Sequence, residues 1–300
     1  MIKRISILGS TGSIGKNLLE IVKKDKKNFK IILLSARKNY ELLLKQANYF
    51  SVKNIIITDY KSYNKAKKIN KNKTIHIYNT FESIDKIFHK KLDYTMSSII
   101  GLQGLYPTLK IIKYTKHIAI ANKEAIICGW SLINKELEKN RTSFLPVDSE
   151  HFSIWKIINS NKDENIDQIY LTASGGPFLN KPINKIKKVK ISDALKHPNW
   201  RMGKKISIDS ATMMNKVFEV IETKNIFTTT YKKISILIHP KSYIHAIVKF
   251  NDGTSKLLAH EPSMKIPIFN TLYLDKYKKF KSNKLDINIL NDLKLSKINK

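Results

Sequence analysis

A short apolar run near the amino terminus leads into a loop that contains three glycines. Residues 5–8 are typical of a buried strand, and Gly9, Gly12 and Gly15 follow it as an apolar pattern of helical spacing begins. A tight turn, a close approach to phosphate and close packing of helix on strand each favour a glycine, and the helix start offers free N–H groups to a pyrophosphate. The chain is therefore expected to begin with a strand, a glycine loop and a helix that bind a dinucleotide.

Further apolar runs continue this rhythm through the first half of the chain. They lie at residues 30–35, 54–58, 94–99 and 117–121, alternating with segments of helical spacing. Such alternation indicates a parallel sheet with right-handed crossovers.

After about residue 148 the rhythm changes. We expect helices near residues 152–159 and 211–223, strands at 168–171, 234–238, 244–250 and 254–258, and a long polar loop. The predicted fold class is α/β, with an N-terminal Rossmann-like doubly wound parallel sheet followed by an α+β catalytic domain.

Composition indicates a folded, strongly basic protein. The chain has 300 residues, 42% of them hydrophobic, which is enough for the cores of two domains. A formal charge of +31 attracts polyanions in general. The lysines are nevertheless scattered along the whole chain, and runs such as residues 185–188 are more often solvated faces than binding sites. We therefore predict no specific nucleic-acid partner.

The chain contains one cysteine, Cys128, which excludes an intramolecular disulfide and a metal site of several cysteines. As a lone thiol, Cys128 is expected to be buried. The sequence shows no secretory or transit segment and no apolar run long enough to span a bilayer. We expect a cytoplasmic protein without a membrane partner.

Cations follow the second apolar run, where Arg37 and Lys38 precede Asn39. An NAD enzyme carries an acidic residue there for the ribose hydroxyls, whereas cations suit the 2′-phosphate of NADP. This position therefore favours NADP.

Two carboxylates, Asp148 and Glu150, are separated by one residue. In an extended segment both would point the same way and hold one cation, and oxygen ligands favour Mg²⁺ or Mn²⁺ over Zn²⁺. The structural alternative is a capping Asp followed by a Glu in the first turn of a helix. Glu219, one helical turn after Asn215, offers a third carboxylate from a second element.

Hydroxyl, amide and ammonium groups gather in the same part of the chain. Ser174 precedes two glycines whose N–H groups suit an anion. Ser210, Asn215 and Lys216 together suit a phosphate or a row of sugar hydroxyls, although Asp209 and Ser210 also fit an ordinary helix cap.

The segment that follows His197 has the composition of a lid. It contains Trp200, Met202 and Gly203, and an aromatic cover with a polar tip is typical of loops that exclude water from an active site. A tryptophan packed on a structural loop is the competing interpretation.

Taken together, these residues resemble the 1-deoxy-D-xylulose 5-phosphate reductoisomerase family. The shared motifs are GSTGSIG, ANKE, LPVDSEH, SGGPF, HPNWxMGxKI, DSATMMNK and HPKSYIH, which extend in order from residue 5 to about residue 268. The resemblance implies an enzyme of the non-mevalonate isoprenoid pathway that uses NADPH and Mg²⁺ or Mn²⁺. It would rearrange 1-deoxy-D-xylulose 5-phosphate by retro-aldol and aldol steps, reduce the aldehyde to 2-C-methyl-D-erythritol 4-phosphate, and form a homodimer.

The resemblance also implies which residues form the site. The implied metal ligands are Asp148, Glu150 and Glu219. The implied substrate-binding residues are Lys123, Ser149, Glu150, Ser174, His197, Ser210, Asn215, Lys216 and Glu219, of which Lys123, Glu150, His197 and Lys216 are the implied catalytic residues. The implied cofactor-binding residues are Thr11, Gly12, Ser13, Ile14, Arg37, Lys38, Asn39, Asn122, Glu124 and Gly203.

Three positions depart from the family pattern. Arg37 replaces a glycine, residues 217–218 are Val-Phe in place of Gly-Leu, and residues 260–265 read HEPSMK in place of GxPDMR. These changes bear on cofactor affinity and local packing more than on the chemistry.

The change of rhythm near residue 148 and the Lys/Asn-rich tail from about Lys276 predict the domain boundaries. The predicted domains are an NADPH-binding domain at residues 1–148, a catalytic domain at 149–275, and a linker or truncated start of the C-terminal region at 276–300. The family continues into a C-terminal helical domain, and this sequence ends at Lys300 near where that domain would begin, as a naturally reduced or a truncated chain.

Two other functions remain open at this point. A generic NADP-dependent semialdehyde or homoserine-type dehydrogenase would keep its activity in EDTA. A catalytically impaired remnant, structural or bound to nucleic acid, would not bind NADPH.

Overall fold

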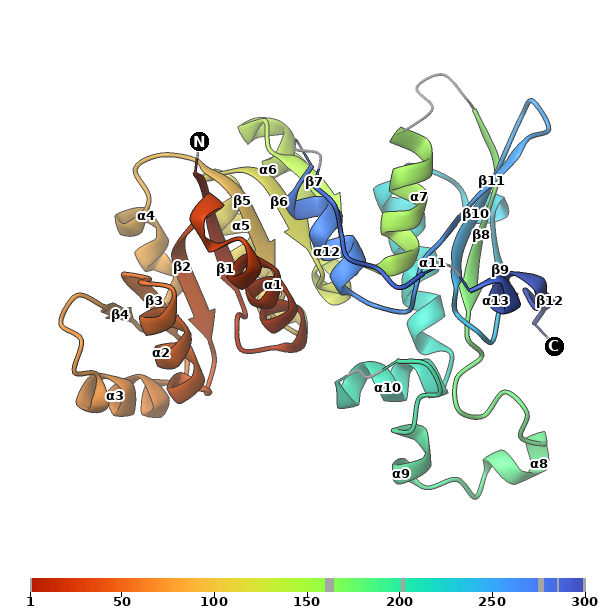
Figure 1. Cartoon of the computed structure of the whole chain (residues 1–300), viewed down its shortest axis with the longest axis horizontal. Helices are drawn as coiled ribbons and strands as arrows, with labels where there is room; N and C mark the ends of the chain where they lie inside the picture. Colours follow the sequence, from red (N-terminus) through yellow and green to blue (C-terminus); the bar gives the residue numbers. More distant parts are fainter. Residues whose placement is uncertain (1, 160–164, 201–202, 275–277, 285, 299–300) are drawn as a thin grey trace. The chain divides into compact units, whose positions relative to one another are not determined.

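Figure 1 shows the computed structural model, which describes residues 2–159, 165–200, 203–274, 278–284 and 286–298. The chain forms two compact units, each with its own sheet. The first unit comprises Met1–Val147 and Ile268–Asp275, and the second comprises Asp148–Pro267 and Lys276–Lys300. The predicted division into domains at residues 148 and 275 stays a prediction, because compact units need not fold independently.

Strands and helices alternate through the first unit (Figure 1). Its strands are β1 (Lys3–Leu8), β2 (Phe29–Ala36), β3 (Asn54–Ile57), β4 (His76–Tyr78), β5 (Leu92–Ser97), β6 (Thr115–Ile120) and β7 (Ser143–Pro146). Its helices are α1 (Ser13–Lys24), α2 (Tyr40–Tyr49), α3 (Tyr60–Ile69), α4 (Ile84–Ile87), α5 (Leu105–Ile112), α6 (Lys123–Asn140) and most of α12 (Lys265–Leu272). Short 3₁₀ turns are η1 (Lys26–Asn28), η2 (Phe81–Ser83) and η3 (Leu102–Gly104).

The sheet of the first unit is parallel and has the order β4-β3-β2-β1-β5-β6-β7. The strand order reverses beside β1, and such a reversal is the switch point at which doubly wound sheets bind their ligands. Ile5, Ile7 and Leu8 of β1 are fully buried, as the central strand of a sheet covered on both faces requires. The glycine loop therefore leaves the sheet at its ligand-binding point.

The last residues of the first unit return to it from later in the chain. The Tyr273 hydroxyl donates to Asp25 Oδ2 at 2.7 Å, and Tyr94 and Thr271 share a hydrogen bond of 3.1 Å. These buried polar contacts fix the end of α12 to the first unit.

The second unit combines a mixed sheet with helices (Figure 1). Its helices are α7 (Ser149–Asn159), α8 (Ile183–Ile186), α9 (Ile191–Ala194), α10 (Lys204–Ala211), α11 (Met214–Ile226) and α13 (Ile287–Asn291), with a 3₁₀ turn η4 (Tyr231–Lys233). Its strands are β8 (Ile166–Ala173), β9 (Ile234–Ile238), β10 (Ile244–Phe250), β11 (Ser255–Ala259) and β12 (Ser296–Lys297), in the order β11-β10-β8-β9-β12. Only the β8–β9 pair is parallel among these described pairs.

Helix α7 packs on this sheet through an apolar core. Ile154 and Ile157 meet Leu171 of β8 together with Val248 and Phe250 of β10, all nearly inaccessible to solvent. Burying each such side chain stabilises the fold by about 1.5–3 kcal/mol. The core therefore holds α7, and with it the first-turn Glu150, against β8 and β10.

The structure confirms the predicted fold class, with a parallel sheet first and an α+β arrangement second. One predicted helix differs, because residues 211–223 are not a single helix. Helix α10 ends at Ala211, Met213 takes a left-handed conformation with φ of 59°, and α11 starts at Met214. The two helices on either side of this turn carry Ser210 and Asn215 respectively.

Cys128 is exposed, so its predicted burial is wrong. Helix α6 buries the face formed by Ile126, Gly129, Ile133 and Leu137, and Cys128 lies outside that stripe. None of the described helices is long and apolar enough to cross a membrane.

Candidate active site

Three carboxylates converge in the second unit. Asp148 directly precedes α7, Glu150 lies in its first turn, and Glu219 lies on α11, with one oxygen of each within 4.8 Å of the others. The extended segment predicted for the first two is wrong, because Glu150 is helical and its N–H donates to Asp148 Oδ1 at 3.3 Å. The capping arrangement thus exists together with the cluster, since the cap folds Asp148 over the first turn of α7.

Lys216 joins two of these carboxylates. Its ammonium donates to Glu150 Oε1 at 2.9 Å, to Glu219 Oε2 and to the carbonyl of Thr172. Burial lowers the pKa of Lys216, but the carboxylates of Glu150 and Glu219 outweigh it and raise that pKa above its usual value. The three carboxylates and the ammonium leave two negative charges in excess, which matches a divalent cation.

Asn215 lies one turn before Glu219 on α11. Its amide nitrogen donates to Glu219 Oε1, whereas its buried Oδ1 has no hydrogen-bond partner within the described part of the chain. A buried acceptor without a partner is unfavourable, so this atom favours a ligand that offers a hydroxyl or amino group. The oxygen-rich donor set and this acceptor fit a hard cation with a hydroxylated substrate.

His151 is a residue of this site that sequence reasoning missed. It is buried, with Nδ1 at 3.3 Å from Asp148 Oδ1 and Nε2 at 3.0 Å from Thr223 Oγ1 and 3.1 Å from the Glu219 carbonyl. The imidazole therefore links the start of α7 to α11. The spacing of three residues between Asp148 and His151 was the available signal, because residues i and i+3 lie on one face of a helix.

Ser174 and His197 form the second polar group of the site. His197 Nδ1 accepts the backbone N–H of Asn199 at 3.1 Å and of Trp200 at 3.0 Å, so its proton resides on Nε2, which donates to Ser174 Oγ at 3.0 Å. Burial lowers the pKa of His197, which keeps the ring neutral. Because Ser174 Oγ also accepts the Gly176 N–H at 3.1 Å, its hydroxyl proton is directed to a further acceptor.

Gly176 brings this loop against α10. Its φ is 70°, and a Cβ there would lie 2.8 Å from the Ser210 carbonyl oxygen. Ser210 lies in the last turn of α10, so it does not cap the following helix as the structural alternative supposed. The backbone approach places Ser210 next to the Ser174 loop.

Ser149 has its hydroxyl engaged within the cluster. Its Oγ donates to Glu150 Oε2, and its side chain is largely buried. Its predicted contact with substrate stays a prediction, and the observed bond gives it a role in orienting Glu150.

The three glycines of the first unit divide the tasks of a dinucleotide loop. Gly9 has a φ of 86°, and a Cβ at Gly15 would lie 2.5 Å from Ser10 Cα, so these two serve the turn and the helix packing. Gly12 precedes α1 without a side-chain cap, which leaves the first N–H groups of the helix to an anion. Thr11, Ser13 and Ile14 lie in the same loop and first turn.

The cations after β2 are exposed, as a phosphate contact requires. Arg37 accepts the Asp59 N–H through its carbonyl at 3.1 Å, and its side chain points away from the core. Asn39 caps α2 by accepting the Leu42 N–H at 3.3 Å. Asn39 thus has a structural role beside the predicted cofactor contact.

Three predicted residues lie together at the start of α6. Asn122 caps this helix through the Ala125 N–H at 2.9 Å, and its amide nitrogen donates to the carbonyls of Ile99 and Gly101. Lys123 is buried and Glu124 partly exposed. These residues belong to the first unit, whereas the carboxylate cluster belongs to the second, so the predicted contact of Lys123 with substrate stays a prediction.

The predicted lid is described in part. Met202 lies outside the described residues, and Gly203 is the N-cap residue of α10. Asn199 donates to the Pro240 carbonyl and to Ser242 Oγ at 2.9 Å, which fixes the segment to the connection between β9 and β10.

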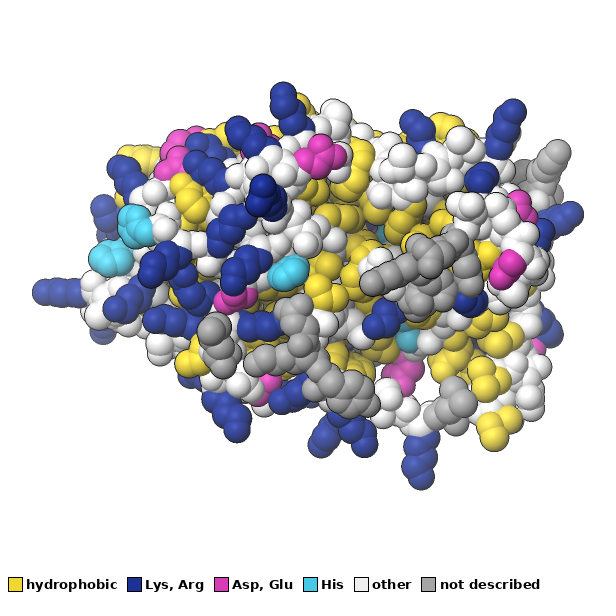
Figure 2. Space-filling model, turned by 90° about the horizontal axis from the view of Figure 1, so that it is seen from above, with side chains coloured by type: hydrophobic (Ala, Val, Ile, Leu, Met, Phe, Trp, Pro, Cys, Tyr) yellow, Lys and Arg dark blue, Asp and Glu magenta, His cyan; other side chains and the backbone are white. Residues whose placement is uncertain are grey.

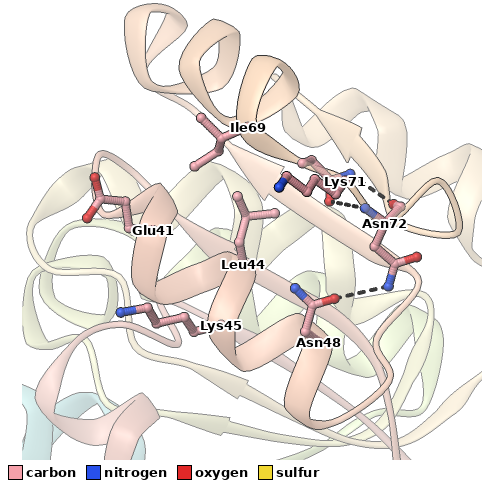
Figure 3. Close-up of a pocket in the computed structure, with 8 residues that line it drawn as sticks. Glu41, Leu44, Lys45, Asn48, Ile69, Lys71 and Asn72 are labelled. Carbon is pink, nitrogen blue, oxygen red and sulfur yellow. Dashed lines mark hydrogen bonds between the residues drawn. The ribbon is translucent and has the colours of Figure 1, made fainter.

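A separate hollow lies in the first unit between α2 and the loop after α3 (Figure 3). Asn72 Nδ2 donates to Asn48 Oδ1 at 3.0 Å across it. Its lining extends along α2 from Glu41 to Asn48 and includes residues 69–72, none of which is a predicted site residue.

Lys and Arg side chains are spread over the face shown in Figure 2, with hydrophobic and acidic side chains among them. This spread accords with a general basic composition. The predicted lack of a specific nucleic-acid partner stays a prediction.

A parallel sheet with a glycine loop at its switch point, followed by a unit with a carboxylate cluster, defines a class: dinucleotide-dependent oxidoreductases with a separate substrate unit. Residues 5–129 match the family model of 1-deoxy-D-xylulose 5-phosphate reductoisomerase, and residues 144–227 match the model of that enzyme's C-terminal domain. The chain belongs to the 1-deoxy-D-xylulose 5-phosphate reductoisomerase family, which confirms the resemblance seen in the sequence.

Individual relatives agree with this assignment. The chain is 59% identical to the reductoisomerase of Pelagibacter ubique over 99% of its own length and 77% of that protein. It is 43% identical to that of Clostridium tetani over 89% of its length and 70% of that protein.

Solved structures show the same likeness. A reductoisomerase from Zymomonas mobilis in complex with NADPH superposes with a TM-score of 0.90 at 33% identity, covering all of this chain and 78% of that one. A reductoisomerase in complex with NADPH, fosmidomycin and magnesium gives 0.90 at 32% identity, covering 98% and 75%. An archaeal homoserine dehydrogenase, at 12% identity and a TM-score of 0.56, shares the fold alone.

Proposed function

We propose that the chain catalyses the rearrangement and NADPH-dependent reduction of 1-deoxy-D-xylulose 5-phosphate to 2-C-methyl-D-erythritol 4-phosphate. In a chain of this family, the observation that carries the proposal is the convergence of Asp148, Glu150 and Glu219, two of which, Glu150 and Glu219, contact the Lys216 ammonium. A homoserine-type dehydrogenase has only the shared fold in its favour.

The carboxylate cluster fits a divalent cation. Asp148, Glu150 and Glu219 would hold it, because three carboxylates with an excess of two negative charges suit Mg²⁺ or Mn²⁺. When bound, the ion supplies Lewis-acid polarisation of the keto and hydroxyl oxygens of the substrate. Asn215 Oδ1 accepts a substrate hydroxyl, and Lys216 orients Glu150 and Glu219.

Ser174, Ser210 and Lys216 supply the groups that suit the phosphate of the substrate. The Ser174 hydroxyl has a proton to donate, because its oxygen already accepts from His197 and Gly176. A neutral His197 fixes the Ser174 rotamer, and the bonds from Asn199 and Trp200 fix His197 in turn. The Ser174 hydroxyl therefore offers an oriented dipole to the phosphate, and the predicted contacts of Ser210 and Lys216 with it are part of the same proposal.

The glycine loop fits NADPH. The N–H groups at the start of α1 receive the pyrophosphate, and Arg37 and Lys38 receive the 2′-phosphate. When bound, NADPH supplies the hydride for the reduction. The remaining predicted contacts, Asn122, Glu124 and Gly203 among them, are part of the same proposal.

A cytoplasmic homodimer is the corresponding proposal for location and assembly. Light scattering coupled to size exclusion would measure the mass of the particle against the 34.7 kDa chain.

The test of function is NADPH oxidation followed at 340 nm with 1-deoxy-D-xylulose 5-phosphate and Mg²⁺. We expect turnover that stops in EDTA and returns with Mg²⁺ or Mn²⁺. Turnover of another NADP substrate that survives EDTA would instead indicate the dehydrogenase.

A further inference from the structure

A column of four aromatic rings crosses the second unit from α7 to the segment that follows His197. Phe152 meets His260 edge-on at 6.3 Å between ring centroids, His260 stacks on His245 at 3.8 Å and 24°, and His245 meets Trp200 edge-on at 6.1 Å. Phe152 lies on α7 two residues after Glu150. The column therefore connects the helix that carries the metal ligand to Trp200.

A β-bulge directs His245 into this column. The pairing of β10 with β11 shifts register between Ile244 and Ala246, which leaves His245 as the extra residue of its strand. Its Nε2 donates to the His260 carbonyl at 3.1 Å. His245 is thus held by the backbone of the residue on whose ring it stacks.

His260 is fixed on both its backbone and its ring. Its N–H donates to the Tyr243 carbonyl at 2.9 Å, and its Nδ1 donates to the Glu261 carbonyl at 2.6 Å. The other ring nitrogen, Nε2, is buried and has no partner among the described residues. What this position contributes to the column is the face of its ring, which stacks on His245.

Trp200 is the end of the column that is hydrogen-bonded to the site. The backbone N–H of Trp200 donates to His197 Nδ1, and His197 Nε2 donates to Ser174 Oγ. The packing of Trp200 therefore sets the orientation of His197 and, through it, of the Ser174 hydroxyl.

We propose that His260 is a positioning residue for the segment from His197 to Trp200, acting through its stack on His245. The effect on turnover rests on the proposed function. The effect on Trp200 does not.

The test is fluorine NMR of the full chain labelled with 5-fluorotryptophan, which gives one resonance for each of Trp130, Trp155 and Trp200, the last assigned by Trp200→Phe. In His260→Gly we expect the Trp200 resonance to shift and broaden. That of Trp130, in the first unit, serves as the internal control and should stay in place. His260→Phe keeps a ring and should restore the wild-type Trp200 resonance.

Kinetics provide the second readout. We expect the KM for 1-deoxy-D-xylulose 5-phosphate to rise about fivefold in His260→Gly, with kcat nearly unchanged, and to recover in His260→Phe. A fivefold change corresponds to the free energy of one aromatic pair. If His260→Gly does not fold, His260→Leu replaces it, since it keeps the volume without the ring.

Two outcomes overturn the proposal: a Trp200 resonance unchanged by loss of the ring, or a His260→Phe variant that behaves like His260→Gly. A wild-type chain without turnover contradicts the proposed function instead, while the resonances still decide the role of His260.

Discussion

The Lys216 ammonium on α11 lies 2.9 Å from the Glu150 carboxylate on α7, and both groups are largely shielded from solvent. The same ammonium contacts Glu219 one turn further along its own helix. A buried ion pair of this kind is costly to break, because the remaining partner keeps its charge without compensation. The contact therefore joins the two helices and permits two carboxylates to face each other.

Replacing Lys216 by methionine should destabilise the metal-free protein. Glu150 and Glu219 would then repel each other in a buried site, at a cost of about 3–5 kcal/mol. Urea unfolding in EDTA measures the loss. We expect Mg²⁺ to restore more stability to Lys216→Met than to the wild type, since a bound cation stabilises the folded state by mass action. Equal stability of the two proteins in EDTA would contradict this account of the pair.

Replacing Glu219 by glutamine should remove a metal ligand while preserving shape. We expect the Mn²⁺ affinity to fall at least about 100-fold, since partners outside the ligand shell alone are worth 10–100-fold. Electron paramagnetic resonance of free Mn²⁺ measures the affinity directly. Glu138→Gln on the exposed part of α6 is the matched control and should bind as the wild type does. Unchanged binding in Glu219→Gln would place the ion elsewhere.

Two glycines of the dinucleotide loop should respond differently to alanine. A Cβ at Gly15 would meet Ser10 Cα at 2.5 Å, so Gly15→Ala should lose about 1–3 kcal/mol of stability through overpacking. At Gly12 the φ is −77°, and an added Cβ would lie 3.3 Å from the Gly9 carbonyl oxygen. The fold should therefore tolerate alanine there with a loss of about 1 kcal/mol or less.

NADPH binding provides the contrast between these variants. Alanine at Gly12 obstructs the approach of the pyrophosphate, and we expect its Kd for NADPH, measured by fluorescence titration, to rise at least about tenfold. If Gly12→Ala binds NADPH normally, the pyrophosphate does not lie at this turn.

Stability should fall as the pH is lowered below 6.5. Burial lowers the pKa of His197 and His260 below their usual 6.5, and burial together with the neighbouring His260 lowers that of His245. The unfolded chain therefore binds more protons than the folded one in this range, so stability is complete above pH 6.5 and declines below it. Urea unfolding between pH 8 and pH 5 measures this slope, and His260→Phe should reduce it. A stability that increases as the pH falls through this window would contradict the assignment.

The fold was largely readable from the sequence because its signals are local. The apolar runs predicted β2, β3, β5 and β6 to within a few residues, and the first glycines predicted the strand, loop and helix with which the chain begins. The turn that separates α10 from α11 was not readable, since it depends on Met213 adopting a positive φ that side chains other than glycine rarely take. Exposure of Cys128 was equally hidden, because it depends on which face of α6 packs.

The sequence predicted which residues form the site, but it did not predict the contacts among them. The motifs indicated Asp148, Glu150 and Glu219, but the hydrogen bonds of His151 and the stack of His245 on His260 join residues far apart in the chain. Contacts of that kind depend on tertiary packing, which no local spacing encodes. The stack of His245 on His260 in particular depends on the bulge in β10, which the sequence does not reveal.

Metal-dependent NADPH oxidation by the purified chain, with 1-deoxy-D-xylulose 5-phosphate as the only other substrate, tests the proposed function most directly. We expect turnover with Mg²⁺ or Mn²⁺, with 2-C-methyl-D-erythritol 4-phosphate as the product identified by mass spectrometry. We expect no turnover in EDTA and at least about a 100-fold loss of turnover in Glu219→Gln. NADPH oxidation that continues undiminished in EDTA or in Glu219→Gln would contradict the proposed function.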